Sequence, residues 1–362
     1  MSIIMKVSAG VMSIPLKTPF RTALRVVDAI NDVFVRVETD DGIVGLGEAP
    51  PTAVITGDTI ESITAAVLTL IAPAVTGRRI DDFEPLTEAV RRAAIGNTSA
   101  KAAVDMALYD IRAKSLNLPL YRLLGGGGAA ELESDVTISL NETRQMIEDS
   151  VSAVRDGFKI LKVKVGRSGL SDARRVLEIR REVGAGIEIR VDANQGWTPK
   201  ESVRIIGTME DGGCDASLVE QPVDARDIDG LRYVTRRTAT PILADEAVFS
   251  PRDAVEIIRT GAADMINIKL MKTGGIREAI KICDIASIYG IPCMMGCMLE
   301  SRLAVSAAAH LASSRSIITM LDLDGPMLCV SDPFIGGPLF AGSRITLTDE
   351  PGIGICDSGV II

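Results

Sequence analysis

A series of charged side chains stands at or near the ends of apolar segments between residues 162 and 324. Lys162 and Lys164 are two residues apart, so on a β-strand both would point to the same side. After Lys164, single charges follow at steps of 28, 28, 25 and 24 residues, and a final pair closes the series: Asp192, Glu220, Asp245, Lys269, Asp322 and Asp324. One charge at a strand end is usually a solvated loop residue. A repeated set beside apolar residues is unfavourable to bury unless its members pair or bind a metal, so the series predicts one shared site.

The three single carboxylates of this series predict a metal site. Carboxylates on successive segments form an all-oxygen site for a hard cation, with Mg²⁺ the first choice and Mn²⁺ possible. The chain contains one histidine and no paired cysteines, so it offers no ready imidazole or thiolate set for zinc. The same composition makes Ser/His/Asp catalysis implausible.

The lysines of the series predict acid and base groups on both sides of this metal. A lysine acts as a base only when it is neutral, and the positive charges of the metal and of a second lysine would lower its pKa towards that state. One base can remove a proton while the other delivers a proton to the opposite face. The metal would stabilise the enediolate that forms from a carboxylate. The pattern therefore predicts proton abstraction next to a carboxylate, with inversion of that carbon.

Eight strand-like segments alternate with amphipathic helical stretches from residue 135 onward. The predicted strands are Asp135–Leu140, Ile160–Val165, Ile187–Asp192, Ser217–Glu220, Ile242–Asp245, Met265–Lys269, Pro292–Gly296 and Ile318–Leu323. The predicted helices are 142–156, 171–183, 199–211, 227–237, 251–260, 275–289 and 301–313. Eight units without a dinucleotide fingerprint favour an α/β fold, a modified TIM (β/α)8-type barrel, over an open doubly wound sheet. The charged series then lies at the carboxyl-end rim, where barrel active sites form.

The pattern of residues 1 to about 125 predicts a separate α+β domain. Val33–Glu38 and Val44–Glu48 flank a turn signal at Thr39–Gly42 and predict a hairpin. Helical patterns follow at 58–72, 81–94 and 99–116. Gly125–Gly128 lacks the Lys-Ser/Thr of a phosphate loop and is interpreted as a domain linker. The barrel is expected over residues 126–340, and residues 341–362 are expected to return to the first domain.

The overall composition limits the class of protein. The 362 residues carry a net charge of −9 and no basic stripe with interleaved aromatics, which disfavours nucleic-acid binding. The start lacks the pattern of a signal peptide, and no apolar helical stretch is long enough for a bilayer, so we expect a cytoplasmic protein. The six cysteines are expected to be buried reduced thiols, and His310 is expected to be a packing residue of a helix.

Five short motifs together resemble the muconate-lactonizing-enzyme subgroup of the enolase superfamily. They are Lys162-Val163-Lys164, Asp192-Ala193-Asn194, Glu220-Gln221-Pro222, Asp245-Glu246 and Ile268-Lys269. The resemblance covers essentially the whole chain, including an N-terminal α+β capping domain over residues 1–125, and it implies roles for the charged series. Lys164 and Lys269 would be the acid/base pair and Lys162 would help to hold the substrate carboxylate. One Mg²⁺ per subunit would be bound by Asp192, Glu220 and Asp245. Relatives of this kind also suggest a homo-oligomer.

Within this subgroup, Asp322-Leu323-Asp324 is similar to the Asp-x-Asp motif of dipeptide epimerases, in which both carboxylates hold the α-ammonium group of the substrate. Phe20–Arg25 and Val54–Asp58 resemble the two capping loops of that family. Arg25 is similar to the cation that meets the Glu side chain in L-Ala-D/L-Glu epimerases, which implies a role in peptidoglycan recycling. Three further positions would line the pocket: Thr137, Cys297 and Leu299, where Cys297 replaces a serine of some glutamate-specific members.

Other activities of the same subgroup remain open. A cycloisomerase, an o-succinylbenzoate synthase or an N-acylamino-acid racemase would use the same lysines and metal. Asp322 and Asp324 discriminate against them, because an acylated or anionic substrate has no ammonium group to bind. A mandelate-racemase-like enzyme would require a His/Asp pair that the sequence does not offer. A non-catalytic barrel protein is disfavoured because both Lys164 and Lys269 are present.

Overall fold

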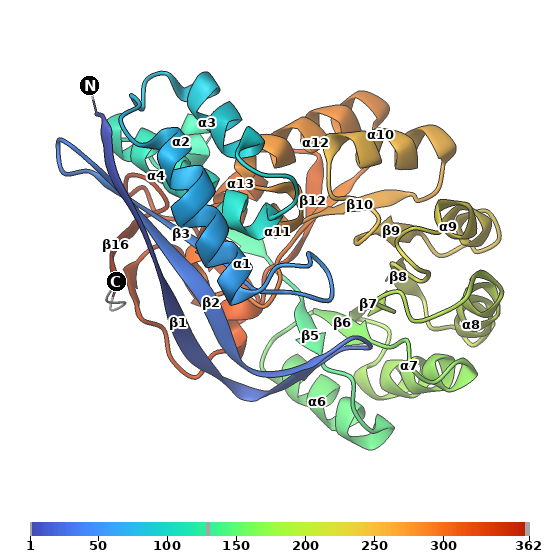
Figure 1. Ribbon diagram of the computed structural model, residues 1–362. Coiled ribbons are helices and arrows are strands. Elements are labelled where there is room, and N and C mark those ends of the chain that lie inside the picture. Colours follow the sequence, from blue (N-terminus) through green and yellow to red (C-terminus); the bar gives the residue numbers. More distant parts are fainter. Residues whose placement is uncertain (1, 128–130, 359–362) are drawn as a thin grey trace.

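An eight-stranded parallel sheet forms the body of the molecule (Figure 1). The structure is a computed structural model and describes residues 2–127 and 131–358. Each strand pairs with its neighbours in chain order: β5 (Val136–Ile138), β6 (Ile160–Lys164), β7 (Glu188–Asp192), β8 (Ala216–Glu220), β9 (Ile242–Ala244), β10 (Met265–Ile268), β11 (Cys293–Gly296) and β12 (Ile318–Asp322). All eight predicted strands are confirmed, and with them the barrel fold.

Helices follow the strands and pack around the outside of the sheet (Figure 1). They are α6 (Thr143–Arg155), α7 (Leu170–Val183), α8 (Pro199–Asp211), α9 (Ile228–Thr235), α10 (Pro251–Thr260), the short α11 (Leu270–Thr273), α12 (Ile276–Tyr289) and α13 (Arg302–Ser313). Their apolar faces pack with strand side chains in one large buried core, and Leu218, Leu243 and Met294 form a separate small apolar cluster. The predicted helices are confirmed within a few residues, whereas α11 was not predicted.

The seam between the first and last strands, β5 and β12, closes through single hydrogen bonds. The N–H of Asp135 donates to the carbonyl of Leu321 over 3.4 Å, and the N–H of Leu323 donates to the Ser134 hydroxyl over 2.8 Å. The Arg190 guanidinium spans the same seam, because it donates both to the Leu321 carbonyl at 2.8 Å and to the Asp135 carboxylate at 2.9 Å. The barrel is therefore nearly closed, with side chains completing the last strand pairing.

An antiparallel three-stranded sheet and a helical layer make up the N-terminal part. The strands are β1 (Ile4–Arg21), β2 (Val26–Thr39) and β3 (Val44–Ala49). A helical segment over residues 60–75 is followed by α3 (Phe83–Arg92), α4 (Thr98–Ser115) and α5 (Leu120–Leu123). The predicted hairpin at Thr39–Gly42 is confirmed as the β2–β3 turn. Helix α4 packs directly on β3. Gly45 and Gly47 allow this close approach, since a Cβ at either position would collide with the carbonyl of Ala107 or Ala103.

The segment predicted as one helix over 58–72 is instead an α-helix with a π-helical stretch. It consists of α1 (Ile60–Ala65), the π-helix η1 (Ala66–Ile71) and α2 (Ala72–Val75). Pro73 has no N–H to donate and its ring crowds the carbonyl four residues earlier. The N–H of Ala72 accordingly bonds the carbonyl of Val67, five residues back. The proline thus widens the helix locally.

Buried carboxylates of the N-terminal part cap two helices of the barrel. Glu48, at the end of β3, accepts bonds from the N–H and hydroxyl of Ser301 at 2.8 and 2.6 Å and from the N–H of Ala304 at 2.9 Å. Asp105, on α4, accepts from the N–H of Ile276 at 2.7 Å. These N–H groups lie at the starts of α13 and α12, where backbone N–H groups have no acceptor within their own helix. The two carboxylates therefore join the N-terminal part to the barrel.

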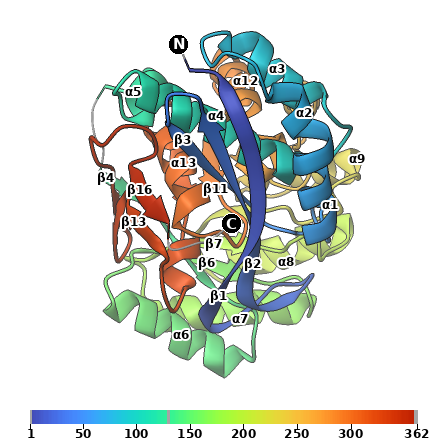
Figure 2. The ribbon, with the colours of Figure 1, turned by 60° about the vertical axis from the view of Figure 1, so that its left-hand side comes forward.

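The C-terminal segment runs back along both parts of the molecule. Strands β13 (Phe334–Gly336) and β16 (Ile355–Ser358) pair with each other, and β14 (Leu339–Ala341) and β15 (Arg344–Thr346) pair with β4 (Glu131–Glu133). Figure 2 shows them on the same side of the molecule as α5. Gly352 bridges to Pro119, and the N–H of Ile353 donates to Asp110 of α4 at 2.9 Å. The domain limits 1–125, 126–340 and 341–362 stay predictions, and Gly128 and residues 359–362 lie outside the described residues.

The single histidine and the cysteines take structural places. His310 is buried in α13, where its Nδ1 accepts the N–H of Tyr121 at 3.1 Å and its ring stacks on the Tyr121 ring. Five cysteines are buried and free of disulfides, which confirms the expectation for them: Cys214, Cys283, Cys293, Cys297 and Cys329. The side chain of Cys356 lies outside the described residues. Within the described ranges, no helix is both long and apolar enough to cross a membrane.

Candidate active site

The charged series lies at the carboxyl ends of neighbouring barrel strands. The strand register aligns Lys164 with Asp192 and Asp192 with Glu220, so these three residues form one row across β6, β7 and β8. Asp245 and Lys269 come directly after β9 and β10, because each of these strands ends one residue earlier than predicted. All five are buried, with exposed fractions of 5 % or less. The predicted convergence of the series at one rim is therefore found.

Lys162 lies beneath this row and neutralises three carboxylates. Its Nζ is 2.6 Å from Asp322, 2.7 Å from Glu220 and 3.3 Å from Asp192. Burial by itself lowers the pKa of Lys162, but attraction to these carboxylates outweighs burial and raises the pKa well above its usual value. Lys162 is therefore held as an ammonium ion at the centre of the site.

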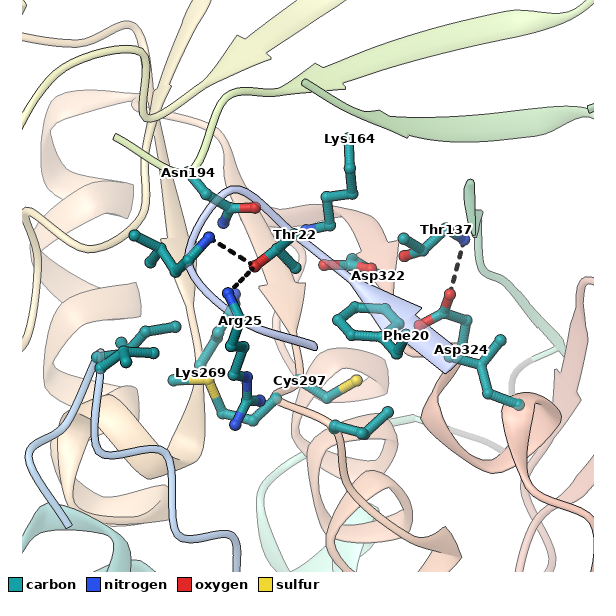
Figure 3. Close-up of a pocket in the computed structure, with 16 residues that line it drawn as sticks. Phe20, Thr22, Arg25, Thr137, Lys164, Asn194, Lys269, Cys297, Asp322 and Asp324 are labelled. Carbon is teal, nitrogen blue, oxygen red and sulfur yellow. Dashed lines mark hydrogen bonds between the residues drawn. The ribbon is translucent and has the colours of Figure 1, made fainter. Parts of the chain in front are cut away.

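Lys164 and Lys269 lie on opposite sides of the barrel, because β6 and β10 are separated by three strands in either direction. Figure 3 shows both side chains at the pocket. Lys164 pairs with Asp192 at 2.5 Å and Lys269 with Asp245 at 2.8 Å. Burial lowers the pKa of Lys269 and Lys162 lowers it further, but Asp245 raises it more, so the net pKa lies above its usual value. The predicted lowering of the pKa of this lysine depends on a bound metal ion and stays a prediction, since a carboxylate is the nearest partner of Lys269 here.

The carboxylates at the barrel mouth outnumber the lysines that neutralise them. Burial and the neighbouring carboxylates raise the pKa of Glu220 to about 7 and that of Glu246 to about 8. One oxygen of Glu246 and the side-chain oxygens of Asn194 and Asn267 are buried without a hydrogen bond. A cation would satisfy such oxygens and the excess negative charge, so the donor set fits a hard divalent ion.

The carboxylates are not arranged as a finished cation site. Across residues 2–127 and 131–358, no three His, Cys, Asp or Glu side chains are grouped closely enough to hold a metal ion. Lysine ammonium groups stand among the three predicted ligands instead: Lys162 beside Asp192 and Glu220, and Lys269 beside Asp245. Binding a metal through these carboxylates would therefore require the lysines to turn aside.

Asp322 and Asp324 line the pocket from the end of β12 (Figure 3). Asp324 accepts the backbone N–H of Thr137 at 2.7 Å, which ties it to β5. Burial raises the pKa of Asp322, but Lys162 outweighs it and lowers the pKa to about 2. Burial and the charge of Asp322 raise the pKa of Asp324 to about 6. Two close carboxylates, one of them destabilised by the other, are a favourable place for a substrate cation.

Both predicted capping loops reach the pocket, and their side chains close it. The predicted residues Arg25, Thr137, Cys297 and Leu299 all line the cavity. The Phe20 ring lies over Lys164, with the ammonium 6.0 Å from the ring centre. The remaining lining residues are Thr22, Leu24, Val54, Ile55, Lys164, Asn194, Lys269, Met298, Asp322, Asp324 and Leu328. Only about 40 Å³ is left free, so a ligand of the size of a dipeptide can enter only when a lining segment moves away.

Lys272 is the charged residue of the site that the sequence pattern did not reveal. It is fully buried on α11, and its Nζ lies 2.7 Å from the Asp245 carboxylate and donates to the carbonyls of Asp245 and Asn267. Burial lowers the pKa of Lys272 although Asp245 opposes this. In the sequence, Lys272 is marked only by its position three residues after Lys269. Glu246 and Asn194 were noted within motifs, but no role was predicted for them.

Two family models match the chain over most of its length. The model described as Mandelate racemase / muconate lactonizing enzyme, N-terminal domain, matches residues 6–125, and the one described as Enolase C-terminal domain-like matches residues 145–356. The chain belongs to the enolase superfamily. The resemblance drawn from the five motifs of the barrel is thereby confirmed.

Two curated relatives of this superfamily member are L-Ala-D/L-Glu epimerases, and a less similar one, 36% identical, is an N-succinyl-L-Arg/Lys racemase from Bacillus cereus. An L-Ala-D/L-Glu epimerase from Clostridium acetobutylicum is 49% identical over 98% of both chains. One from Bacillus subtilis is 46% identical over 99% of this chain and 98% of its own. A solved structure of a substrate-liganded complex of the Bacillus subtilis enzyme matches with a TM-score of 0.97 at 45% identity, covering 99% of this chain and 100% of that one.

A second solved relative carries both a metal and a dipeptide. It is a dipeptide epimerase from Enterococcus faecalis complexed with Mg and L-Leu-L-Tyr, with a TM-score of 0.94 and 39% identity. The match covers 98% of this chain and 100% of that one. The two solved relatives therefore share this fold over the full length.

Proposed function

We propose that the protein is a dipeptide epimerase that inverts the α-carbon of the C-terminal residue, with L-Ala-D/L-Glu dipeptides as its substrates. The observation that carries this proposal is the pair Lys164 and Lys269, which reach one closed pocket from opposite strands of the barrel. One lysine would take the α-proton from one face of the substrate and the other would deliver a proton to the opposite face. The near-complete match to L-Ala-D/L-Glu epimerases supports the same reaction.

We further propose that one Mg²⁺ per subunit, with Mn²⁺ possible, is held by Asp192, Glu220 and Asp245. The excess of buried carboxylates and the unpaired oxygens beside them support this assignment. When bound, the ion would share the charge of these carboxylates and stabilise the negative charge that develops on the substrate carboxylate. Lys269 would act as a base only after it leaves the Asp245 carboxylate, which now keeps it protonated.

The remaining pocket residues would bind the two ends and the side chain of the dipeptide. Asp322 and Asp324 would hold the α-ammonium group, and Lys162 would attract the substrate carboxylate. Arg25 would meet the acidic side chain. Three residues would complete the walls of the pocket: Thr137, Cys297 and Leu299. A cytoplasmic location, a homo-oligomeric state and a role in peptidoglycan recycling stay predictions that accompany this function.

Deuterium uptake from D₂O into a library of dipeptides, followed by mass spectrometry with Mg²⁺ present, tests the proposal. We expect exchange of the α-hydrogen of the C-terminal residue in L-Ala-L-Glu and close acidic relatives. Exchange confined to hydrophobic or cationic dipeptides would keep the reaction and overturn the acidic specificity. No exchange in any dipeptide, with exchange in N-acylamino acids, would instead favour a racemase of acylated substrates and leave Asp322 and Asp324 without a role.

A further inference from the structure

A second cavity adjoins the candidate active site behind Arg25. Its volume is about 170 Å³, and Arg25 and Leu299 line both this cavity and the active-site pocket. Asp32 of β2 and Thr52 lie on the walls of the second cavity. In Figure 3 the Arg25 side chain extends away from Lys164, towards one end of the pocket. Arg25 therefore forms part of the partition between the two cavities.

The second cavity contains buried polar atoms without partners. Asp32 is 2 % exposed and Thr52 is fully buried, yet one carboxylate oxygen of Asp32 and the hydroxyl of Thr52 form no hydrogen bond. Buried polar atoms are normally bonded, so such a pair indicates a place that receives a donor group. The guanidinium of Arg25, with five N–H donors on a flexible stem, is the donor in the partition.

The charges around Asp32 make Arg25 its natural partner. Burial and the neighbouring carboxylates of Glu48 and Glu300 raise the pKa of Asp32 well above its usual value, and Arg25 is the group that lowers it. Burial conversely lowers the pKa of Arg25, and Asp32 opposes that effect. An arginine keeps its charge under such conditions. The two side chains form no ion pair in the described structure, so the charge of Arg25 acts across the cavity, where it favours the ionised form of Asp32.

We propose that Asp32 is a positioning residue that holds the Arg25 guanidinium from behind and thereby sets the preference for an acidic side chain in the substrate. The side-chain subsite then has two layers. Arg25 would face the substrate, and Asp32, on the wall of the second cavity, would lie behind it. Without Arg25 the two cavities would join, and the acidic wall would accept a cationic group. The role of Asp32 in substrate preference rests on the proposed function. The binding of a cation by the acidic wall does not, because it concerns only the affinity of that wall for a guanidinium ion.

Steady-state kinetics of Asp32→Asn with L-Ala-L-Glu and the uncharged L-Ala-L-Gln test the positioning role. We expect KM for L-Ala-L-Glu to rise about tenfold with a much smaller change in kcat, because a misplaced guanidinium weakens binding of the carboxylate. KM for L-Ala-L-Gln should change far less. Asp28→Asn, an exposed change on the same strand, is the matched control, and Asp32→Glu should retain the discrimination because the charge is kept. An equal rise for both substrates, or none, would overturn the role of Asp32.

Binding of methylguanidinium to the folded, full-length Arg25→Ala variant, measured by calorimetry, tests the acidic wall without any turnover. We expect binding to Arg25→Ala and its loss in the Arg25→Ala/Asp32→Asn double variant and in the unmodified protein. Equal binding to the single and double variants, or no binding to either, would remove Asp32 as the counter-charge. Should the unmodified protein epimerise no acidic dipeptide, the proposed function fails while this measurement still decides the inference. If Arg25→Ala does not fold, the kinetics of Asp32→Asn decide.

Discussion

Buried carboxylates are satisfied in two different ways in two regions of this molecule. Where the N-terminal part meets the barrel, Glu48 and Asp105 accept backbone N–H groups at the first turns of α13 and α12. At the barrel mouth, Asp192 and Asp245 instead contact the ammonium groups of lysines. A backbone donor is fixed by its helix, whereas a lysine side chain can rotate away. The first arrangement is suited to holding parts together and the second to exchanging partners.

This difference indicates which buried charges belong to the chemistry. Removing a carboxylate at the interface leaves helix N–H groups unpaired and should lower stability. Removing a lysine at the barrel mouth should instead leave the fold in place and change the reaction. The predictions below test this division, in order of decreasing effect.

Replacement of either candidate catalytic lysine should have the largest effect. We expect Lys164→Ala or Lys269→Ala to reduce epimerisation by about 10³-fold, because each removes an acid or base group on one face. The remaining lysine should still allow one variant to exchange the α-hydrogen of a single substrate epimer with D₂O. Circular dichroism and turnover are the measurements, and the exposed Lys200→Ala on α8 is the control. Turnover at the unmodified level in either variant would refute the two-base assignment.

Metal removal should come next. We expect EDTA treatment to reduce turnover by about 10²-fold or more and added Mg²⁺ to restore it, because the proposed ion stabilises developing charge. Mg²⁺ should also raise the melting temperature, since an ion that binds only the folded state stabilises it. In Glu220→Gln, which lacks one of the proposed ligands, added Mg²⁺ should neither restore turnover nor raise the melting temperature. Full activity after exhaustive chelation would exclude the metal site.

The buried histidine adds a pH dependence of its own, in a place separate from both carboxylate regions. Burial lowers the pKa of His310 to about 4, against a usual value near 6.5, with a smaller opposing contribution from the backbone of Ile353. The unfolded chain thus binds the proton more strongly, so the contribution is present above pH 6.5 and is lost as the pH falls towards 4. Its full size is roughly 3 kcal/mol. Urea unfolding between pH 7 and 4 should show a smaller loss of stability in His310→Asn, and an unchanged pH profile would contradict the burial argument.

Loss of the interface carboxylate should have a smaller effect, on stability. Glu48→Gln replaces one of two accepting oxygens by an amide donor facing the N–H of Ser301 or Ala304. We expect the free energy of unfolding to fall by about 2 kcal/mol, because helix donors lose their partner. Urea denaturation measures this, with Glu182→Gln on the exposed side of α7 as control. If both variants unfold alike, the capping role of Glu48 is wrong.

The sequence predicted those features that repeat along the chain. The spacing of Lys164, Asp192 and Glu220 matches the strand register residue for residue, because each β/α unit brings the chain back to the same rim. Features that depend on contacts between distant segments were not predicted. Lys272 acquires its meaning only from its contact with Asp245, which belongs to another β/α unit. The pKa of Lys269 likewise depends on which charged group lies nearest to it, and the sequence does not give that distance.

The C-terminal segment has a consequence for how the chain is made. Helices α4 and α5 receive their partners from residues near the end of the sequence, where Gly352 bridges to Pro119 and Ile353 bonds to Asp110. A ribosome synthesises α4 long before those partners exist. The N-terminal part therefore emerges with Asp110 lacking one of its donors and waits through the synthesis of all eight barrel strands. Completion of the N-terminal part thus has to wait until the segment that follows the barrel has been synthesised.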